Sequence, residues 1–423
     1  MSPARTLRGR LLCPHADEAR VVLVADGLLE IDAQGTIAAV GPAPTDCELP
    51  ESFPGAVLLP GFVDAHVHFP QTRVLGSASG PLLPWLTRSV FPEEARFAEA
   101  RYAAAVAWEF CEQLVRHGTT SAAIYSSSHP IAAELLFTEL ERRGLRALVG
   151  LTLMDRGAPP ELLLAAGPAL DACTALVERW HGRDGGRLQF CVTPRFALSC
   201  TPALLRGAAA LAERHALPVQ THLAENHDEI SATASAFPGS GDYLAVYDDH
   251  GLCGPRSLFA HCIHLSEGAW DRMAARGAAV AHCPDSNFFL GSGCMDLHAP
   301  TRRGVRVGLG TDVGAGRSFS LRQVMAAAHD AALIVAASAG GGSRSRVSSE
   351  ALLWHATRGG ARALGLDRPG MRVGCLAPGY EADVVALDLP EAITDAAALC
   401  DAIAFRRDAG PARAVLVRGR TLR

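Results

Sequence analysis

Short apolar runs alternate with long amphipathic stretches through most of the chain. Eight of these runs have the length of buried strands, and each ends in a polar loop. They cover residues 56–68, 118–127, 146–155, 188–196, 218–225, 257–265, 278–287 and 305–314. Helical stretches lie between them, so the pattern predicts an α/β protein whose eight strands close into a (β/α)8 TIM-like barrel.

The amphipathic stretch 93–118 is predicted to form one long helix. Glu93 and Glu94 lie in its first turn, where the positive end of the helix dipole stabilises acidic side chains. Gly118 follows the last turn and is expected to end the helix.

The two ends of the chain have a different pattern from the middle. Short β-rich segments occupy residues 19–32 and 35–41 near the N-terminus, and 381–389 and 412–420 near the C-terminus. Because the two ends are alike, we expect their strands to pair in one small β-sandwich domain. The expected domains are therefore 1–58 and 367–423 for the β domain, and 59–366 for the barrel.

Composition and charge narrow the classes of partner. The 423 residues are 49% hydrophobic, enough for a large core, and the net charge of −5 with no Lys/Arg block argues against a nucleic-acid partner. We find neither a secretory signal nor an apolar run of about 20 residues, so we expect no membrane partner and a cytoplasmic location. The 12 cysteines include no C-x-x-C pair, which indicates reduced thiols rather than cysteine-based zinc sites.

Polar side chains gather where the predicted strands end. In a barrel of this kind the carboxyl ends of the strands form the active site. The candidates there are His66, His68 and Gln71 after the first strand, Arg195 and Phe196 after the fourth, His222 and Glu225 after the fifth, His261 after the sixth, and Asp312 after the eighth. We expect these side chains to converge on one mouth.

Three imidazoles and a carboxylate are suitable ligands for zinc. His66 and His68 would point to the same face, because side chains at i and i+2 of a strand do so. A catalytic zinc keeps one position open for water and lowers the pKa of that water to roughly 7. Glu225, three residues past His222, would be within reach as a proton shuttle. Iron suits the same ligands and stays open as an alternative.

Most single histidines need no catalytic explanation. His15, His181, His215 and His250 are interpreted as hydrogen-bonded core or surface residues, and no role is assigned to His129, His264 or His282. The glycines around Asp312 lack phosphate-loop spacing, and neither H-E-x-x-H nor the zinc-deaminase P-C-x-x-C element occurs.

Several of these segments together resemble a known family. "PGFVDAHVH", "THLAEN", "AHC" and "GLGTD" are similar to the amidohydrolase superfamily, in its mononuclear metal-dependent deaminase branch. "HVHFPQ", the W-L…F-P-x-E segment, "TPRFALSC" and "AHCPDSNFFLGSG" resemble the guanine deaminase family more narrowly. The resemblance covers residues 60 to about 366.

The resemblance implies an activity and a role for each candidate. One zinc per subunit would be held by His66, His68, His222 and Asp312, with guanine beside His68 and His222. Gln71 would bind the purine, Arg195 would donate to its carbonyl oxygen, and Phe196 would pack on the ring. Glu225 would protonate the ring nitrogen next to the reacting carbon, Asp312 would take a proton from the water, and His261 would hold the hydroxide. The implied reaction converts guanine to xanthine and ammonia in a homodimer.

Three alternatives remain open at this point. A sister aminohydrolase acting on a triazine or an oxidised purine would share the metal ligands and differ at the substrate contacts. A non-catalytic scaffold would be expected to lack ligands. A two-metal cyclic amidase usually needs a bridging lysine at the end of strand four, where this chain has Arg195.

Overall fold

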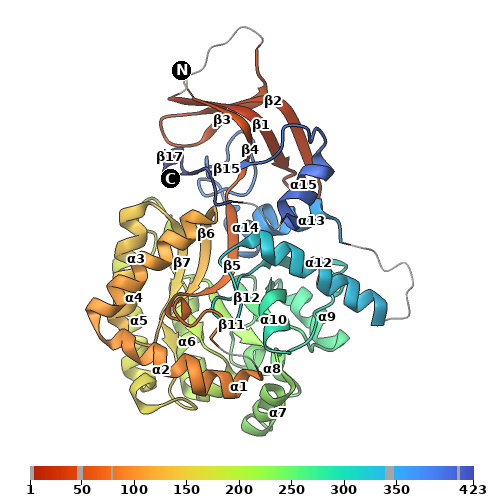
Figure 1. Ribbon diagram of the computed structural model, residues 1–423. Helices are drawn as coiled ribbons and strands as arrows, with labels where there is room; N and C mark the ends of the chain where they lie inside the picture. The colour runs from red at the N-terminus through yellow and green to blue at the C-terminus, as the bar shows by residue number, and fades with distance from the viewer. Residues whose placement is uncertain (1–3, 45–50, 78–79, 339–346, 407–409) are drawn as a thin grey trace.

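The computed structural model describes residues 4–44, 51–77, 80–338, 347–406 and 410–423. Figure 1 shows two parts, a barrel surrounded by helices and a sheet of terminal strands at one end of it. The carboxyl ends of the barrel strands face the opposite end, where α1 (Leu82–Trp85) and α2 (Phe91–Ala95) lie.

Eight strands form the barrel, as the apolar pattern predicts. They are β5 (Phe62–His68), β6 (Thr119–Tyr125), β7 (Arg146–Gly150), β9 (Leu188–Phe190), β11 (Val219–Leu223), β12 (Ser257–His261), β13 (Ala279–His282) and β14 (Arg306–Leu309), with the short β8 (Thr152–Leu153) and β10 (Thr193–Pro194) extending two of them. All pairings within β5-β6-β7-β9 and within β11-β12-β13-β14 are parallel.

Backbone hydrogen bonds close the two runs of strands into a ring. On one side Gln220 N donates to Val192 O at 3.0 Å, next to a parallel bridge between Val192 and Val219. On the other, Asp312 N donates to His66 O at 2.8 Å. The expected TIM-like barrel is therefore confirmed, and this second bond already brings two candidate site residues together.

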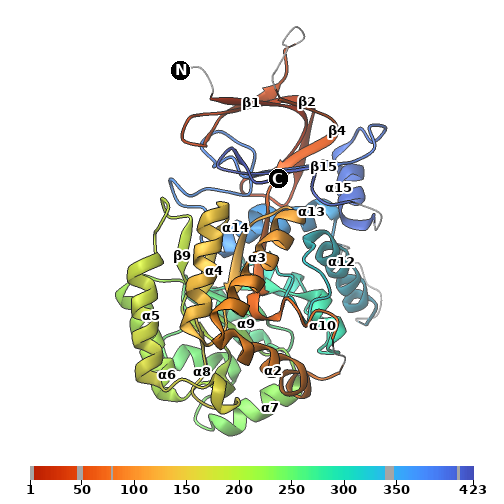
Figure 2. The same cartoon turned by 60° about the vertical axis from the view of Figure 1, so that its left-hand side comes forward.

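Helices surround the barrel strands (Figures 1 and 2). They are α3 (Ala100–Arg116), α4 (Pro130–Arg143), α5 (Ala166–Trp180), α6 (Pro202–Arg214), α7 (His227–Ala236), α8 (Tyr243–Asp249), α9 (Glu267–Arg276), α10 (Pro284–Phe289), α11 (His298–Thr301), α12 (Leu321–Ser338), α13 (Ser349–Trp354) and α14 (Gly360–Ala363). The segment Pro160–Trp180, which contains α5, is apolar and long enough to cross a membrane by composition alone, so the expectation of no such run was wrong. Its buried residues Ala169, Cys173, Leu176 and Trp180 recur at helical spacing, as in an amphipathic barrel helix.

Two sequence predictions about single elements were wrong. The apolar run 56–68 is two strands, because the chain leaves the terminal sheet at Pro60 and enters the barrel at Phe62. A side chain at the intervening Gly61 would collide with Thr120. The stretch 93–118 is a chain of short helices that breaks at Glu99, whose backbone is extended with φ −86° and ψ 114°. Only α3 is long, and Gly118 follows it with φ 79°, as a C-terminal stop requires.

Strands from both termini form one sheet. Its order is β17-β16-β15-β4-β1-β2-β3, a single seven-stranded sheet in the place where the sequence indicates a sandwich. The strands are β1 (Arg5–Pro14), β2 (Val21–Ile31), β3 (Ile37–Pro42), β4 (Glu51–Pro60), β15 (Val384–Asp388), β16 (Ala414–Val417) and β17 (Arg420–Thr421). The sequence pattern missed β1, and it missed helix α15 (Ala396–Phe405), which Ser349 on α13 contacts through a 2.6 Å hydrogen bond to Asp401.

A buried arginine joins the sheet to the bottom of the barrel. Arg146 at the start of β7 is fully buried, and its Nε lies 3.2 Å from Asp383 just before β15. Its other contact is the carboxylate of Glu381, which also pairs with Arg418. Two carboxylates of the C-terminal segment thus contact one arginine of a barrel strand.

Candidate active site

Four candidate metal donors lie at the ends of β5, β11 and β14. Nε2 of His68 is 3.2 Å from Nε2 of His66, 3.2 Å from Nε2 of His222 and 3.2 Å from Oδ1 of Asp312, and His66 Nε2 is also 3.2 Å from that oxygen. Donors about 2.0–2.1 Å from a tetrahedral zinc lie roughly 3.3–3.4 Å from one another. The four spacings therefore fit donors that share one ion.

The orientation of His222 leaves its Nε2 free to act as a donor to a metal. Its Nδ1 lies 2.5 Å from the backbone oxygen of Arg195, a distance that requires the proton to be on Nδ1. The hydroxyl of Tyr247 donates to the backbone oxygen of His222 at 2.7 Å. Two contacts thus hold the ring and the strand end in place.

Asp312 is held by the strand beside it. Its backbone φ is 48°, and Asp64 on β5 accepts a 2.9 Å hydrogen bond from the neighbouring Thr311 N. Burial alone would raise the pKa of the Asp312 carboxyl, but His66 and the other imidazoles around it lower that pKa well below its usual range. The carboxylate is therefore ionised, as a metal ligand must be.

His68 is equally suited to ligation because it stays neutral. Burial lowers the pKa of its imidazole to about 3, against the opposing effect of Asp312. A neutral ring keeps a lone pair for a metal at any physiological pH.

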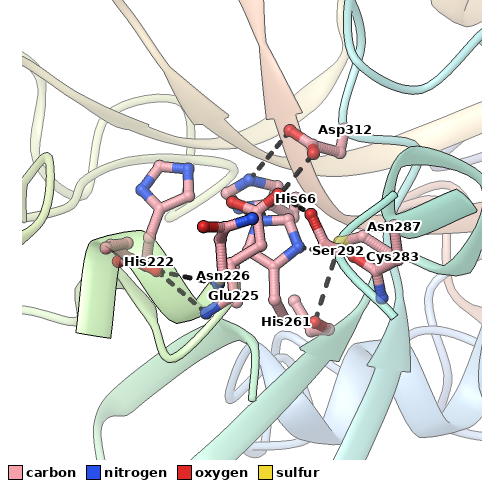
Figure 3. A network of polar contacts seen from close by, with 12 residues as sticks. His66, His222, Glu225, Asn226, His261, Cys283, Asn287, Ser292 and Asp312 are labelled. Atoms are coloured by element: carbon pink, nitrogen blue, oxygen red, sulfur yellow. Dashed lines mark hydrogen bonds and ion pairs between the residues drawn. The ribbon is translucent and has the colours of Figure 1, made fainter. Parts of the chain in front are cut away.

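His261 lies close to the same donors, beside Asp312 and Glu225 (Figure 3). Its Nε2 is 3.8 Å from Asp312 Oδ2 and 3.4 Å from Glu225 Oε2, and its Nδ1 is 2.9 Å from Asn287 Oδ1. A second possible set of ligands includes this residue. Its four ligand atoms, one from each residue, lie within 4.8 Å of one another, and the residues are His66, His222, His261 and Asp312. Distance alone therefore allows His261 to reach the same ion, but the tighter 3.2 Å spacings belong to His68.

Glu225 is buried beside the donors, where the pKa of its carboxyl is raised. Burial and the charge of Asp312 raise the pKa of Glu225 to about 8, although a 3.1 Å hydrogen bond from Ser292 Oγ opposes the shift. The backbone N–H of Glu225 donates to Glu229 Oε2 at 3.0 Å. Sequence reasoning gave no role to Ser292 or Glu229, although Ser292 lies within the quoted segment "AHCPDSNFFLGSG".

A pocket opens from these donors toward α1. It is lined by His68, Gln71, Leu82, Trp85, Leu86, Arg195, Phe196, His222, Glu225, Glu229, His261, Leu290, Asp312 and Ala315. The structure thus brings eight of the nine candidate residues to one cavity, and the ninth, His66, lies directly behind His68.

Arg195 forms a buried ion pair with Glu94, a residue that the sequence analysis placed at the positive end of a helix dipole. Its Nη1 lies 2.7 Å from Oε2 of Glu94, and its guanidinium stands 5.4 Å from the ring centre of Phe91. Glu94 is buried, so its main partner is Arg195 and not the helix dipole. The F-P-x-E segment, whose last residue is Glu94, is the sequence signal that could have identified this pair.

Gln71 ends a short 3-10 turn, η1 (Phe69–Gln71), directly after His68. Its Oε1 accepts a 3.0 Å hydrogen bond from Gly314 N, in the loop that follows Asp312. The fixed carbonyl orients the amide NH2 group, which makes no hydrogen bond to any described residue. Gln71 is therefore mainly a donor toward the pocket, whereas the sequence indicated both a donor and an acceptor.

Three histidines without an assigned role lie outside the pocket. His264 Nε2 is 2.8 Å from the backbone oxygen of Ser292, so it supports the loop that contacts Glu225. His282 is buried, and burial lowers the pKa of its imidazole to about 3. His129 immediately precedes helix α4 and has no side-chain contact with a candidate donor among the described residues.

Comparisons with known proteins agree on the class of this fold and site. Residues 57–422 match the amidohydrolase family. A probable guanine deaminase of Deinococcus radiodurans is 41% identical over 383 residues, which is 88% of this chain and 85% of the relative. The crystal structure of a guanine deaminase from C. acetobutylicum with guanine in its active site superposes with a TM-score of 0.91 at 29% identity, covering 99% of both chains. An adenosine deaminase from Xanthomonas campestris with bound Zn has a TM-score of 0.83 at 26% identity, covering 98% of this chain and 92% of the other.

Proposed function

The chain belongs to the amidohydrolase family, and from this membership we propose that it hydrolyses guanine to xanthine and ammonia with the help of one bound metal ion. The observation that carries the proposal is a single cavity with metal donors and Glu225 at one end and Arg195 in its wall. The guanine deaminases among its relatives support the same substrate.

His66, His68, His222 and Asp312 are the residues that would hold the ion. Their donor atoms, three imidazole nitrogens and a carboxylate oxygen, suit zinc, and the zinc in the Xanthomonas relative supports that metal over iron. The ion would lower the pKa of a bound water to roughly 7 and so make a nucleophile available near neutrality.

Glu225 would act as the acid of the reaction. Because the pKa of Glu225 is raised to about 8, its carboxyl carries a proton at neutral pH and can protonate N3, the ring nitrogen beside the carbon that bears the amine. Asp312, which is ionised, would accept a proton from the attacking water. The departing amine takes up a proton from the same pair and leaves as ammonia.

Arg195 and Gln71 would orient the purine. Glu94 holds one end of the Arg195 guanidinium, so its remaining N–H groups are presented in a fixed direction to the carbonyl oxygen O6. Adenine has an amine at that position, and binding it would leave the buried arginine without an acceptor. His261, whose Nδ1–H donates to Asn287 Oδ1, would accept a hydrogen bond at Nε2 from the attacking water and so hold it at the reacting carbon.

An assay of ammonia release separates the proposed substrate from its rivals. We expect the metal-loaded protein to release ammonia from guanine much faster than from adenine, cytosine or the aminotriazine ammeline. Glu225→Gln is the matched control, because it should bind metal and guanine but lose most turnover. Faster release from ammeline would identify a triazine aminohydrolase, and no release with bound zinc would favour a scaffold. The homodimer and the cytoplasmic location stay predictions.

A further inference from the structure

Trp85 contributes a polar group to the pocket that the proposed reaction does not yet use. The side chain is 2% exposed and lines the pocket from helix α1, and its indole N–H has no acceptor among the described residues. Buried tryptophan N–H groups usually find a partner, because leaving one unpaired costs free energy. A buried donor that faces a binding pocket is therefore satisfied when a ligand brings an acceptor.

The surroundings of Trp85 keep this donor in one place. The indole packs in an apolar cluster formed with Leu82, Leu86, Phe91 and Phe196 among others. These neighbours offer only apolar surface to the ring. Helix α1 lies across the carboxyl end of the barrel (Figure 1), whereas the histidine donors are on β5 and β11 and Asp312 follows β14.

The acceptors of guanine can be assigned one by one if the proposed function holds. Guanine presents three of them, O6, N3 and N7. O6 is assigned to Arg195, and N3 to the protonated carboxyl of Glu225 next to the reacting carbon. N7 is left, and it lies on the five-membered ring, at the far side of the purine from the carbon at the metal. That side would face α1.

We propose that the indole N–H of Trp85 donates a hydrogen bond to N7 of the bound purine and selects substrates that have an acceptor there. This inference rests on the proposed function and adds a specificity-determining residue to it. Two other donors in the pocket are alternative readers of N7: Arg195, because arginine can contact O6 and N7 of guanine together, and the free amide NH2 of Gln71. Nη1 of Arg195 is already committed to Glu94, which reduces the N–H groups available for a second contact.

The test compares guanine with 7-deazaguanine, which has C–H in place of N7. Calorimetric binding is measured on zinc-loaded Glu225→Gln protein, so that turnover does not obscure affinity. In this background we expect guanine to bind about five- to tenfold more tightly than 7-deazaguanine, the value of one hydrogen bond. Adding Trp85→Phe or Trp85→Tyr should remove that preference, while Trp108→Phe, an exposed tryptophan on α3, should leave it unchanged.

The other possible results would overturn either this inference or the proposed function. A preference that survives both Trp85 substitutions would assign N7 to Arg195 or Gln71 and overturn the inference. Equal binding of the two purines by protein with Trp85 intact would overturn it as well, without any need for the variants to fold. If the zinc-loaded parent binds neither purine, the proposed function itself fails.

Discussion

Oε2 of Glu94 lies 2.7 Å from Nη1 of Arg195, across 101 residues of sequence, and both side chains are buried. Glu94 comes from α2 and Arg195 from the segment that follows β10, so the pair joins the helices over the pocket to the barrel strands. The orientation of the proposed guanine-reading arginine therefore depends on a residue outside the barrel.

Glu94→Gln should impair substrate recognition more than the chemical step. The amide cannot hold the guanidinium as a charged partner does, so we expect KM for guanine to rise roughly tenfold and the preference over adenine to narrow. Glu93→Gln is the matched control, because Glu93 pairs with Arg96 and Tyr102 instead. Equal steady-state constants for the two variants would show that Glu94 does not position Arg195.

Ser292→Ala should shift the pH profile of the reaction. Glu225 acts in its protonated form in this account, so activity falls as pH rises through the pKa of that carboxyl, which is raised to about 8. The Ser292 hydroxyl lowers this pKa by donating to the ionised form, so removing it should move the basic limb of kcat/KM to higher pH. A shift to lower pH, or none, would mean that the basic limb does not report Glu225.

His68→Ala and His261→Ala should separate metal binding from catalysis. The 3.2 Å spacings place His68 among the ligands, so its removal is expected to lower metal content, turnover and thermal stability together. His261→Ala should retain about one ion per chain and lose activity, because its Nε2 lies farther away, 3.8 Å from the nearer oxygen of Asp312. The check is metal analysis and a thermal melt on each variant; loss of metal from His261→Ala alone would reassign the ligand.

Arg146→Met should destabilise the protein without changing its chemistry. The substitution removes the ion-pair partner of the buried Asp383 and leaves Glu381 paired with Arg418 alone, and breaking a buried ion pair in this way costs about 3–5 kcal/mol. Arg142→Met, at an exposed pair with Glu139, should cost less than about 1 kcal/mol. Denaturant unfolding of both variants measures the difference, and similar midpoints would show that Arg146 does not stabilise the contact between the barrel and the terminal sheet.

The barrel could be predicted from sequence because its strands are continuous apolar runs. The convergence of His66, His222 and Asp312 followed from the same pattern, since carboxyl ends of parallel strands meet at one rim. The prediction of one helix over 93–118 was wrong, because hydrophobic periodicity does not reveal that the backbone is extended at Glu99. There the chain turns from the pocket to the barrel wall.

The contacts around the candidate donors could not be predicted in the same way. Ser292 contacts Glu225 from a loop, and Trp85 lines the pocket from a four-residue helix; the position of each segment depends on tertiary packing. The sequence showed Glu94 only as an acidic residue in the first turn of a helix. Its partner Arg195 is 101 residues away and could not be inferred from that local pattern. Sequence periodicity reports which face of an element is buried, but not which distant side chain it contacts.

We expect guanine hydrolysis to depend on one ion held between His66, His68, His222 and Asp312. The most direct measurement is xanthine formation by protein stripped of metal and reloaded with increasing zinc, with bound metal determined on the same samples. Turnover is expected to rise in proportion to bound zinc and to reach its plateau at one ion per chain. Full turnover by stripped protein, or no turnover at one bound ion per chain, would contradict it.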